Sequence, residues 1–229
     1  MSGSTEAVFF DVDFTLIYPG PTFQGAGYQQ FCAGHGIDVD ITRFDAAVRD
    51  ASSILDVQQD HVYEHDVFVR YVRRIIEYMG GGGPRLDECA RRIYDEWAAC
   101  RHFFMYDDVP DALRTLAARG FKLGLISNSH RSLHSFQQHF ELEGLITAAI
   151  SSAEHGYMKP HPSIFATALN LAGVTAEESV MVGDSLTHDI AGALSAGMRG
   201  VLVHRSGAPI DVPPDVSVIR SLAELPLLF

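Results

Sequence analysis

The sequence predicts an α/β fold in which a parallel sheet is covered by helices on both faces. Short apolar runs, each typical of a buried strand, alternate with segments of helical length that carry one apolar face. A stretch of roughly 80 residues after the first run carries only helical patterns. We therefore expect a parallel-sheet domain that is interrupted, after its first strand, by an inserted helical segment.

The first strand is expected at residues 7–13, an apolar run that ends in carboxylates before the turn-like residues 18–21. Four later runs share its brevity, and several of the helical segments between them stop at a glycine. The expected later strands are residues 123–127, 148–151, 179–183 and 200–204, and the expected helices are residues 111–119, 132–140, 162–172 and 189–196. This alternation is typical of crossover connections between parallel strands.

The inserted segment is expected to be all-helical, with no convincing buried strand. Its long helical patterns are residues 44–57, 61–78 and 86–102. The glycine run and proline at residues 80–84 lack the preceding strand and the Lys-Ser/Thr ending of a phosphate-binding loop, so they indicate a helix stop. The expected domains are therefore residues 1–17 with 106–229, and residues 18–105.

The composition excludes several classes of partner. With 29 acidic and 17 basic residues, the net charge is −12, which argues against binding to nucleic acid or to anionic membranes. No basic residue precedes Arg43 and no apolar run approaches ~18 residues, so we expect neither a presequence nor a membrane span. Cys32, Cys89 and Cys100 form no CxxC pair and are expected to be buried apolar side chains. A cytoplasmic protein is expected.

Polar residues follow the expected strands at the edge of the sheet where ligands gather. Asp11 and Asp13 begin on one side of the first strand, and two adjacent carboxylates need a cation or a shared proton. An ordinary structural role, as a helix cap or in a turn, is an equal alternative for Asp11 and Asp13. Ser127 and Asn128 end the second strand at a helix N-terminus, which is either an anion site or an ordinary cap.

A lysine and further carboxylates follow the later strands. Lys159 is one of two lysines in the chain, and an ammonium at this junction suits a phosphoryl group and a carboxylate together, although a surface lysine is an equal alternative. Asp184 and Asp189 supply the hard oxygen ligands that Mg²⁺ prefers, unless they only end a strand and cap a helix. Each feature is ambiguous by itself.

The order and spacing of the four motifs resemble those of the haloacid dehalogenase-like hydrolase superfamily. These motifs are the DxDxT sequence at residues 11–15, the pair Ser127-Asn128, Lys159, and the pair Gly183-Asp184 with Asp189. The resemblance covers essentially the whole chain and implies a Rossmann-like, doubly wound core with an inserted all-helical cap. Phe14 stands before Thr15 where many members have glycine, so the local turn is expected to differ.

The resemblance implies phosphoryl transfer through an aspartyl-phosphate. Asp11 is then the nucleophile, and Asp13 protonates the leaving alcohol and afterwards activates water. Ser127, Asn128 and Lys159 are expected to hold the phosphate, and Lys159 also balances the charge of Asp11.

The resemblance further implies a Mg²⁺ cofactor. Its expected ligands are the carboxylates of Asp11 and Asp184 and the backbone carbonyl of Asp13. Thr15 and Asp189 are expected in supporting positions around these groups.

The implied activity is Mg²⁺-dependent hydrolysis of a phosphomonoester, with a small phosphorylated metabolite as the substrate. A sugar-phosphate mutase shares every motif and remains an open alternative. A haloacid dehalogenase is less favoured because such members lack the second aspartate, which is Asp13 here. A non-catalytic binding protein is also less favoured because no motif carboxylate is missing.

Overall fold

A computed structural model describes residues 4–56 and 60–229 of the chain. The chain forms two compact units: the core unit, Met1–Tyr18 with Met105–Phe229, and the helical unit, Pro19–Phe104. These bounds differ by one residue from the domain limits expected from the sequence. The chain passes between the units in β2 (Ile17–Pro19) and β3 (Phe103–Met105), which pair as a two-stranded sheet.

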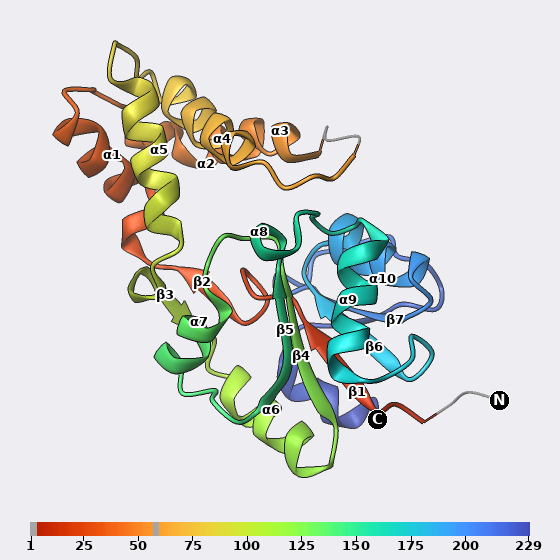
Figure 1. The fold of residues 1–229 in the computed structure, drawn as a ribbon. Coiled ribbons are helices and arrows are strands. Elements are labelled where there is room, and N and C mark those ends of the chain that lie inside the picture. The colour runs from red at the N-terminus through yellow and green to blue at the C-terminus, as the bar shows by residue number, and fades with distance from the viewer. Residues whose placement is uncertain (1–3, 57–59) are drawn as a thin grey trace. The chain divides into compact units, whose positions relative to one another are not determined.

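The core unit is built on a six-stranded sheet in which every neighbouring pair is parallel (Figure 1). The strand order is β5-β4-β1-β6-β7-β8. The strands are β1 (Ala7–Phe10), β4 (Lys122–Ser127), β5 (Ile146–Ser151), β6 (Ser179–Gly183), β7 (Arg199–Val203) and β8 (Ser217–Ile219). The predicted α/β class is confirmed. β8 lies outside the predicted strands because two of its three residues are exposed, so it has no buried apolar run.

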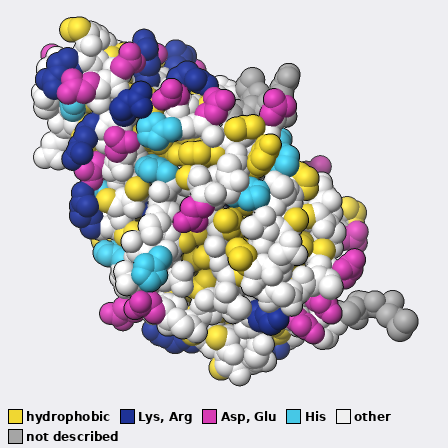
Figure 2. All heavy atoms as spheres, viewed as in Figure 1, with side chains coloured by type: hydrophobic (Ala, Val, Ile, Leu, Met, Phe, Trp, Pro, Cys, Tyr) yellow, Lys and Arg dark blue, Asp and Glu magenta, His cyan; other side chains and the backbone are white. Residues whose placement is uncertain are grey.

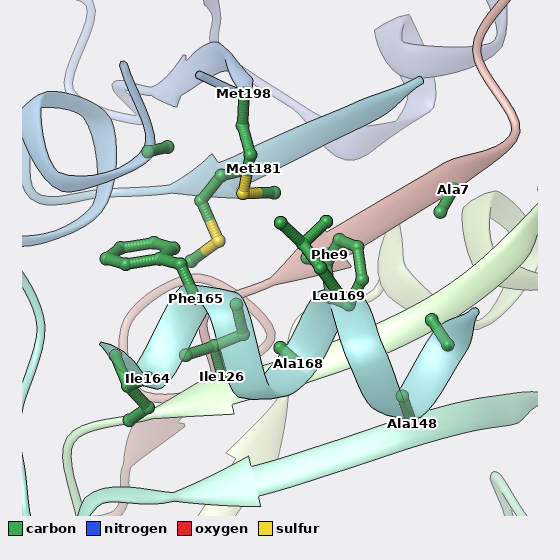
Figure 3. Close-up of a cluster of buried hydrophobic side chains, with 12 residues drawn as sticks. Ala7, Phe9, Ile126, Ala148, Ile164, Phe165, Ala168, Leu169, Met181 and Met198 are labelled. Atoms are coloured by element: carbon green, nitrogen blue, oxygen red, sulfur yellow. The ribbon is translucent and has the colours of Figure 1, made fainter. Parts of the chain in front are cut away.

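Both faces of the sheet are covered. Phe9 and Met181 of the sheet lie in one buried cluster with α9 (Pro162–Ala172), in which Met181 points toward Phe165 and Phe9 lies beside Leu169 (Figure 3). Phe10, which points to the opposite face because side chains alternate along a strand, is also fully buried. The remaining helices of the core unit are α6 (Val109–Ala118), α7 (Leu133–His139), α8 (Ser152–His155) and α10 (Gly192–Ser195). The doubly wound arrangement is thus present.

The helix expected at residues 189–196 begins earlier than predicted. A π-helical turn, Leu186–Ala191, precedes α10, and the hydroxyl of Ser185 accepts a hydrogen bond from the backbone N–H of His188 at 3.0 Å. Ser185 therefore caps this segment, and Asp189 lies inside it, which frees the Asp189 side chain for other contacts.

The helical unit is built mainly from helices, of which α2, α4 and α5 are amphipathic. The expectation of an all-helical insertion is wrong at its two ends, where residues of β2 and β3 fall inside the unit. α4 (His65–Tyr78) packs against α2 and α5 with a buried apolar face that includes Val72 and Ile76. The other helices are α1 (Gly25–Gly34), α2 (Phe44–Ala51), α3 (Ser53–Asp56) and α5 (Leu86–Trp97). Figure 2 shows Arg side chains interspersed with Asp and Glu on the visible face of this unit, which contains no lysine. Arg73, for example, pairs with both Glu77 and Asp87.

Several predicted helical patterns of this unit differ from the observed helices. The pattern at 44–57 is divided into α2 and α3, and residue 57 lies outside the described residues. The pattern at 86–102 ends at Trp97, and a separate 3₁₀ turn, Cys100–His102, follows it. α1 is missed because its glycines lower helix propensity. One of them, Gly27, is needed because a Cβ there would lie 2.1 Å from the carbonyl oxygen of Thr22.

Two simpler expectations agree with the structure. All three cysteines are buried and unbridged. The glycine run ends α4, with Gly80 at φ 95°, a backbone conformation that favours glycine. Among the described residues, no helix combines the length and the apolar character needed to cross a membrane.

Candidate active site

The sheet order brings the predicted motifs to one edge. β1 lies at the centre with β4 and β6 on either side. Asp11 and Asp184 come directly after β1 and β6, and Ser127 is the last residue of β4, so all three lie at the carboxyl ends of adjacent strands. From β1 the chain first builds the β4–β5 side and then crosses to β6, and ligands of doubly wound proteins bind at such a reversal.

Lys159 lies at the centre of the site. Its Nζ donates hydrogen bonds of 2.6 Å to Asp11 Oδ1 and of 2.6 Å to Asp189 Oδ1. Burial alone would lower the pKa of Lys159, but the two carboxylates raise it above its ordinary value, so the ammonium is retained. With 1% of its surface exposed, Lys159 is not a surface lysine.

The loop after β4 fixes the backbone of Lys159. The Asn128 side-chain amide donates to the carbonyl of Lys159 at 2.9 Å, and its oxygen accepts from the Lys159 N–H at 2.7 Å. Asn128 therefore uses both ends of its side chain on Lys159. Ser127 is fully buried, and its hydroxyl lies 3.0 Å from that of Ser129. The phosphate-binding roles of Ser127 and Asn128 stay predictions.

The loop after β6 supplies two carboxylates. Asp189 is buried and accepts a second hydrogen bond, from the backbone N–H of Ser185 at 2.9 Å. Gly183 is required here because a Cβ would lie 2.3 Å from the Asp189 carboxyl group. Asp184 is exposed and accepts a 3.4 Å hydrogen bond from the buried Thr15 hydroxyl.

Three carboxylates can hold a metal ion together. Oxygens of Asp11, Asp184 and Asp189 all lie within 4.8 Å of one another. Desolvation raises the pKa of Asp11 well above its ordinary value, Lys159 opposes this, and Asp189 and Asp184 add to it. Although Asp184 is exposed as a whole residue, its carboxyl group is largely removed from water, and this desolvation and then the charge of Asp189 raise its pKa to about 7. One ammonium is too little positive charge for three ionised carboxylates, and this deficit fits a divalent cation.

The carboxylate of Asp13 is separate from this cluster. Asp13 Oδ2 accepts a 3.0 Å hydrogen bond from Nη1 of Arg131, whose side chain is fully buried. The predicted metal ligand at Asp13 is the backbone carbonyl, so the position of the carboxylate does not test it. This contact stays a prediction. Arg131 is not among the predicted site residues because it stands four positions after Ser127, outside every motif. Its only sequence signal is a basic side chain in a site loop.

Phe14 has the backbone conformation that a glycine would favour. Its φ is 67°, in the left-handed region, and its N–H donates to the carbonyl of Ile17 at 2.6 Å. Phe14 thus adopts, at the cost of backbone strain, a conformation that glycine would adopt freely. The expected difference between this turn and the turn of family members that have glycine there stays a prediction.

Comparisons with known proteins agree with these motifs. A family model described as "Hydrolase: haloacid dehalogenase-like hydrolase" matches residues 5–197. Phosphoserine phosphatase of Thermus thermophilus is 33% identical over 65% of this chain and 60% of its own length. N-acylneuraminate-9-phosphatase of Mus musculus is 31% identical over 78% of this chain and 69% of its own length.

A solved structure gives the same result for the fold. The 2-haloacid dehalogenase from Pseudomonas syringae matches with a TM-score of 0.66 and 26% identity, over 98% of this chain and 97% of that one. The chain spans only 49% to 60% of the length of three of the curated relatives that it matches.

The turn at Phe14 leads to a prediction about stability. Phe14→Val should lower the free energy of unfolding by about 1–2 kcal/mol, because a β-branched side chain tolerates positive φ poorly. Phe14→Gly should stay within about 1 kcal/mol of the wild type, because relief of strain is offset by a more flexible unfolded chain. Urea unfolding of the two variants measures the difference, and equal stabilities would contradict it.

Proposed function

The chain belongs to the haloacid dehalogenase-like hydrolase family, and on this premise we propose that it is a Mg²⁺-dependent phosphatase of small phosphorylated metabolites. The observation that carries the proposal is the Asp11 carboxylate, hydrogen-bonded to Lys159 at 2.6 Å beside two further carboxylates at the carboxyl end of β1. A nucleophile, a fixed cation and a group of hard oxygen ligands are thus brought together. The two relatives named as phosphatases support the same reaction class.

In the first step, an Asp11 oxygen attacks phosphorus and the bond between phosphorus and the alcohol oxygen breaks. The product is an aspartyl-phosphate, which divides one difficult displacement into two easier ones. Lys159 stays protonated beside Asp11 and supplies positive charge where the phosphoryl oxygens arrive. Asp13 must carry a proton when the phosphate dianion is bound, and it gives this proton to the leaving alcohol oxygen.

In the second step, water attacks the phosphorus of the aspartyl-phosphate. Asp13, now ionised, takes a proton from the water, inorganic phosphate leaves, and the Asp11 carboxylate is restored. Two carboxylates are therefore needed, one that bonds to phosphorus and one that transfers protons. The structure keeps their carboxyl groups on different cations, Lys159 and Arg131.

Asp11, Asp184 and Asp189 are the side chains that would hold Mg²⁺. When bound, the ion supplies the positive charge that keeps these carboxylates ionised and reduces their repulsion toward a phosphate dianion. The sequence predicts only a supporting position for Asp189. We include it among the side chains that would hold Mg²⁺, because its carboxyl oxygens lie close to those of Asp11 and Asp184.

A dehalogenase is the main rival, given the structural likeness to the Pseudomonas syringae enzyme. Displacement of a halide needs no proton for the leaving group, so the presence of Asp13 favours phosphate esters. The deciding experiment incubates the protein with a panel of metabolite phosphates and with 2-haloacids. Release of inorganic phosphate supports the proposal; release of halide contradicts it, and isomerised phosphate esters without free phosphate would instead indicate a mutase.

Replacing the nucleophile should abolish turnover without unfolding the protein. Asp11→Asn is expected to lower kcat by roughly 10³-fold or more, because no other group can form the acyl phosphate. Phosphate release and thermal unfolding are measured together. Activity within tenfold of the wild type would contradict the assignment of Asp11.

Replacing Asp13 should affect substrates according to their leaving groups. Asp13→Asn is expected to slow alkyl phosphates by about 10²–10⁴-fold, whereas the first step with an activated aryl phosphate should change much less. Because water activation is also lost, phosphoenzyme should accumulate with the aryl phosphate. Burst kinetics and intact mass measure this, and equal slowing of all substrates without phosphoenzyme would disprove the role in proton transfer.

Mg²⁺ affinity should depend on pH. The pKa of Asp184 is about 7 without metal, so below pH 7 the ion must displace a proton from this carboxyl group. We expect the Kd for Mg²⁺ to be at least about tenfold higher at pH 6 than at pH 8, because Asp184 alone accounts for that factor and the raised pKa of Asp11 acts in the same direction. Isothermal titration calorimetry on the protein alone measures this Kd. Asp184→Asn is the control and should bind weakly at both values. A Kd independent of pH in the wild type would contradict this.

A further inference from the structure

Arg131 is a charged side chain that the motifs do not account for. It is 1% exposed and is among the largest fully buried side chains of the described residues. Its Nη1 donates to Asp13 Oδ2 at 3.0 Å, so it joins the loop after β4 to the loop after β1, which is 118 residues away in sequence. The contact lies entirely within the core unit.

Stability alone is a weak reason for such a pair. Removing a guanidinium and a carboxylate from water is costly, and well-packed apolar side chains often stabilise a protein as much as a buried ion pair does. A cation with a purely structural role could also pair with any nearby carboxylate. Arg131 instead pairs with Asp13, which is the proton-transferring group of the proposed reaction.

The chemistry of arginine suits a group that must hold Asp13 without exchanging protons with it. A guanidinium stays protonated in proteins and presents its donors in a fixed plane, whereas an ammonium rotates freely and can lose its proton when buried. Arg131 therefore fixes one oxygen, Oδ2. The other oxygen, Oδ1, accepts no hydrogen bond from any residue in the described part of the chain.

We infer that Arg131 is a positioning residue for Asp13: it holds Oδ2 and so makes Oδ1 the oxygen that gives and takes the proton. The inference rests on the proposed function, because it assumes that Asp13 transfers protons. The two cations then have separate tasks. Lys159 serves the attacking carboxylate, and Arg131 orients the carboxylate that serves the leaving group.

The test is a double-mutant cycle with Asp13→Asn, using Arg131→Gln and Arg131→Lys. Arg131→Gln should lower kcat for an alkyl phosphate by about 10- to 100-fold, because a misplaced catalytic group costs about that much. KM should change little, and kcat for the first step with an aryl phosphate should change less. Arg131→Lys should recover part of the loss, since it keeps the charge but not the planar donors.

The cycle shows whether Arg131 acts through Asp13. In the Asp13→Asn background, either substitution at Arg131 should cause no further loss with the alkyl phosphate. A further loss as large as in the wild-type background would overturn the inference, because Arg131 would then act on the substrate itself. Equal slowing of alkyl and aryl substrates would overturn it as well.

Two controls separate this result from misfolding and from failure of the proposed function. Arg119→Lys changes an arginine of the core unit that bonds carbonyls of the C-terminal segment, and it should leave both substrates unaffected. Thermal unfolding is recorded for every variant, and if Arg131→Gln does not fold, the comparison of Arg131→Lys in the two backgrounds decides. A wild type that cleaves no phosphomonoester rejects the proposed function and the inference with it. If the wild type is active but the substitutions at Arg131 cause a full further loss in the Asp13→Asn background, only the inference about Arg131 is rejected.

Discussion

The buried ammonium of Lys159 is the interaction on which the site depends. It lies between Asp11 and Asp189, which follow β1 and β6, and Asn128 after β4 holds its backbone. These contacts join segments that are far apart in sequence, and the parallel sheet makes them possible because it ends its central strands at one edge. A buried lysine without these partners would lose its proton, so the charge and the geometry of the site depend on each other.

The balance of charge around Lys159 explains why the site can recruit a cation. Three carboxylates lie beside one ammonium, and their mutual repulsion adds to the desolvation that raises the pKa values of Asp11 and Asp184. Asp13 does not add to the deficit, because Arg131 neutralises it separately. The four carboxylates therefore divide into a group of three that is suited to a divalent ion and a single one that keeps its own counter-ion.

Site residues near the ends of buried strands can be predicted from sequence more readily than those in loops. Asp11, Lys159 and Asp184 could be predicted because the apolar pattern of the buried strands shows where the carboxyl edge of the sheet lies. The order of the motifs, which resembles that of a known family, then removed the ambiguity that each residue has by itself. Ser185 could not be predicted as the cap, since Asp189 is an equally good capping residue in sequence. Arg131 could not be predicted either, because its contact with Asp13 depends on the path of a loop, which no periodic pattern encodes.

Three cations contact the loop after β1. Its alternate residues each contact a cation from a different segment: Asp11 contacts Lys159, Asp13 contacts Arg131, and the carbonyl of Thr15 accepts a 2.9 Å hydrogen bond from Arg205. Such polar contacts contribute little net stability when buried, and the left-handed turn within this loop adds strain. The apolar residues Val12 and Leu16 of this loop are fully buried, so apolar burial provides the stability of the loop and the cations provide its orientation.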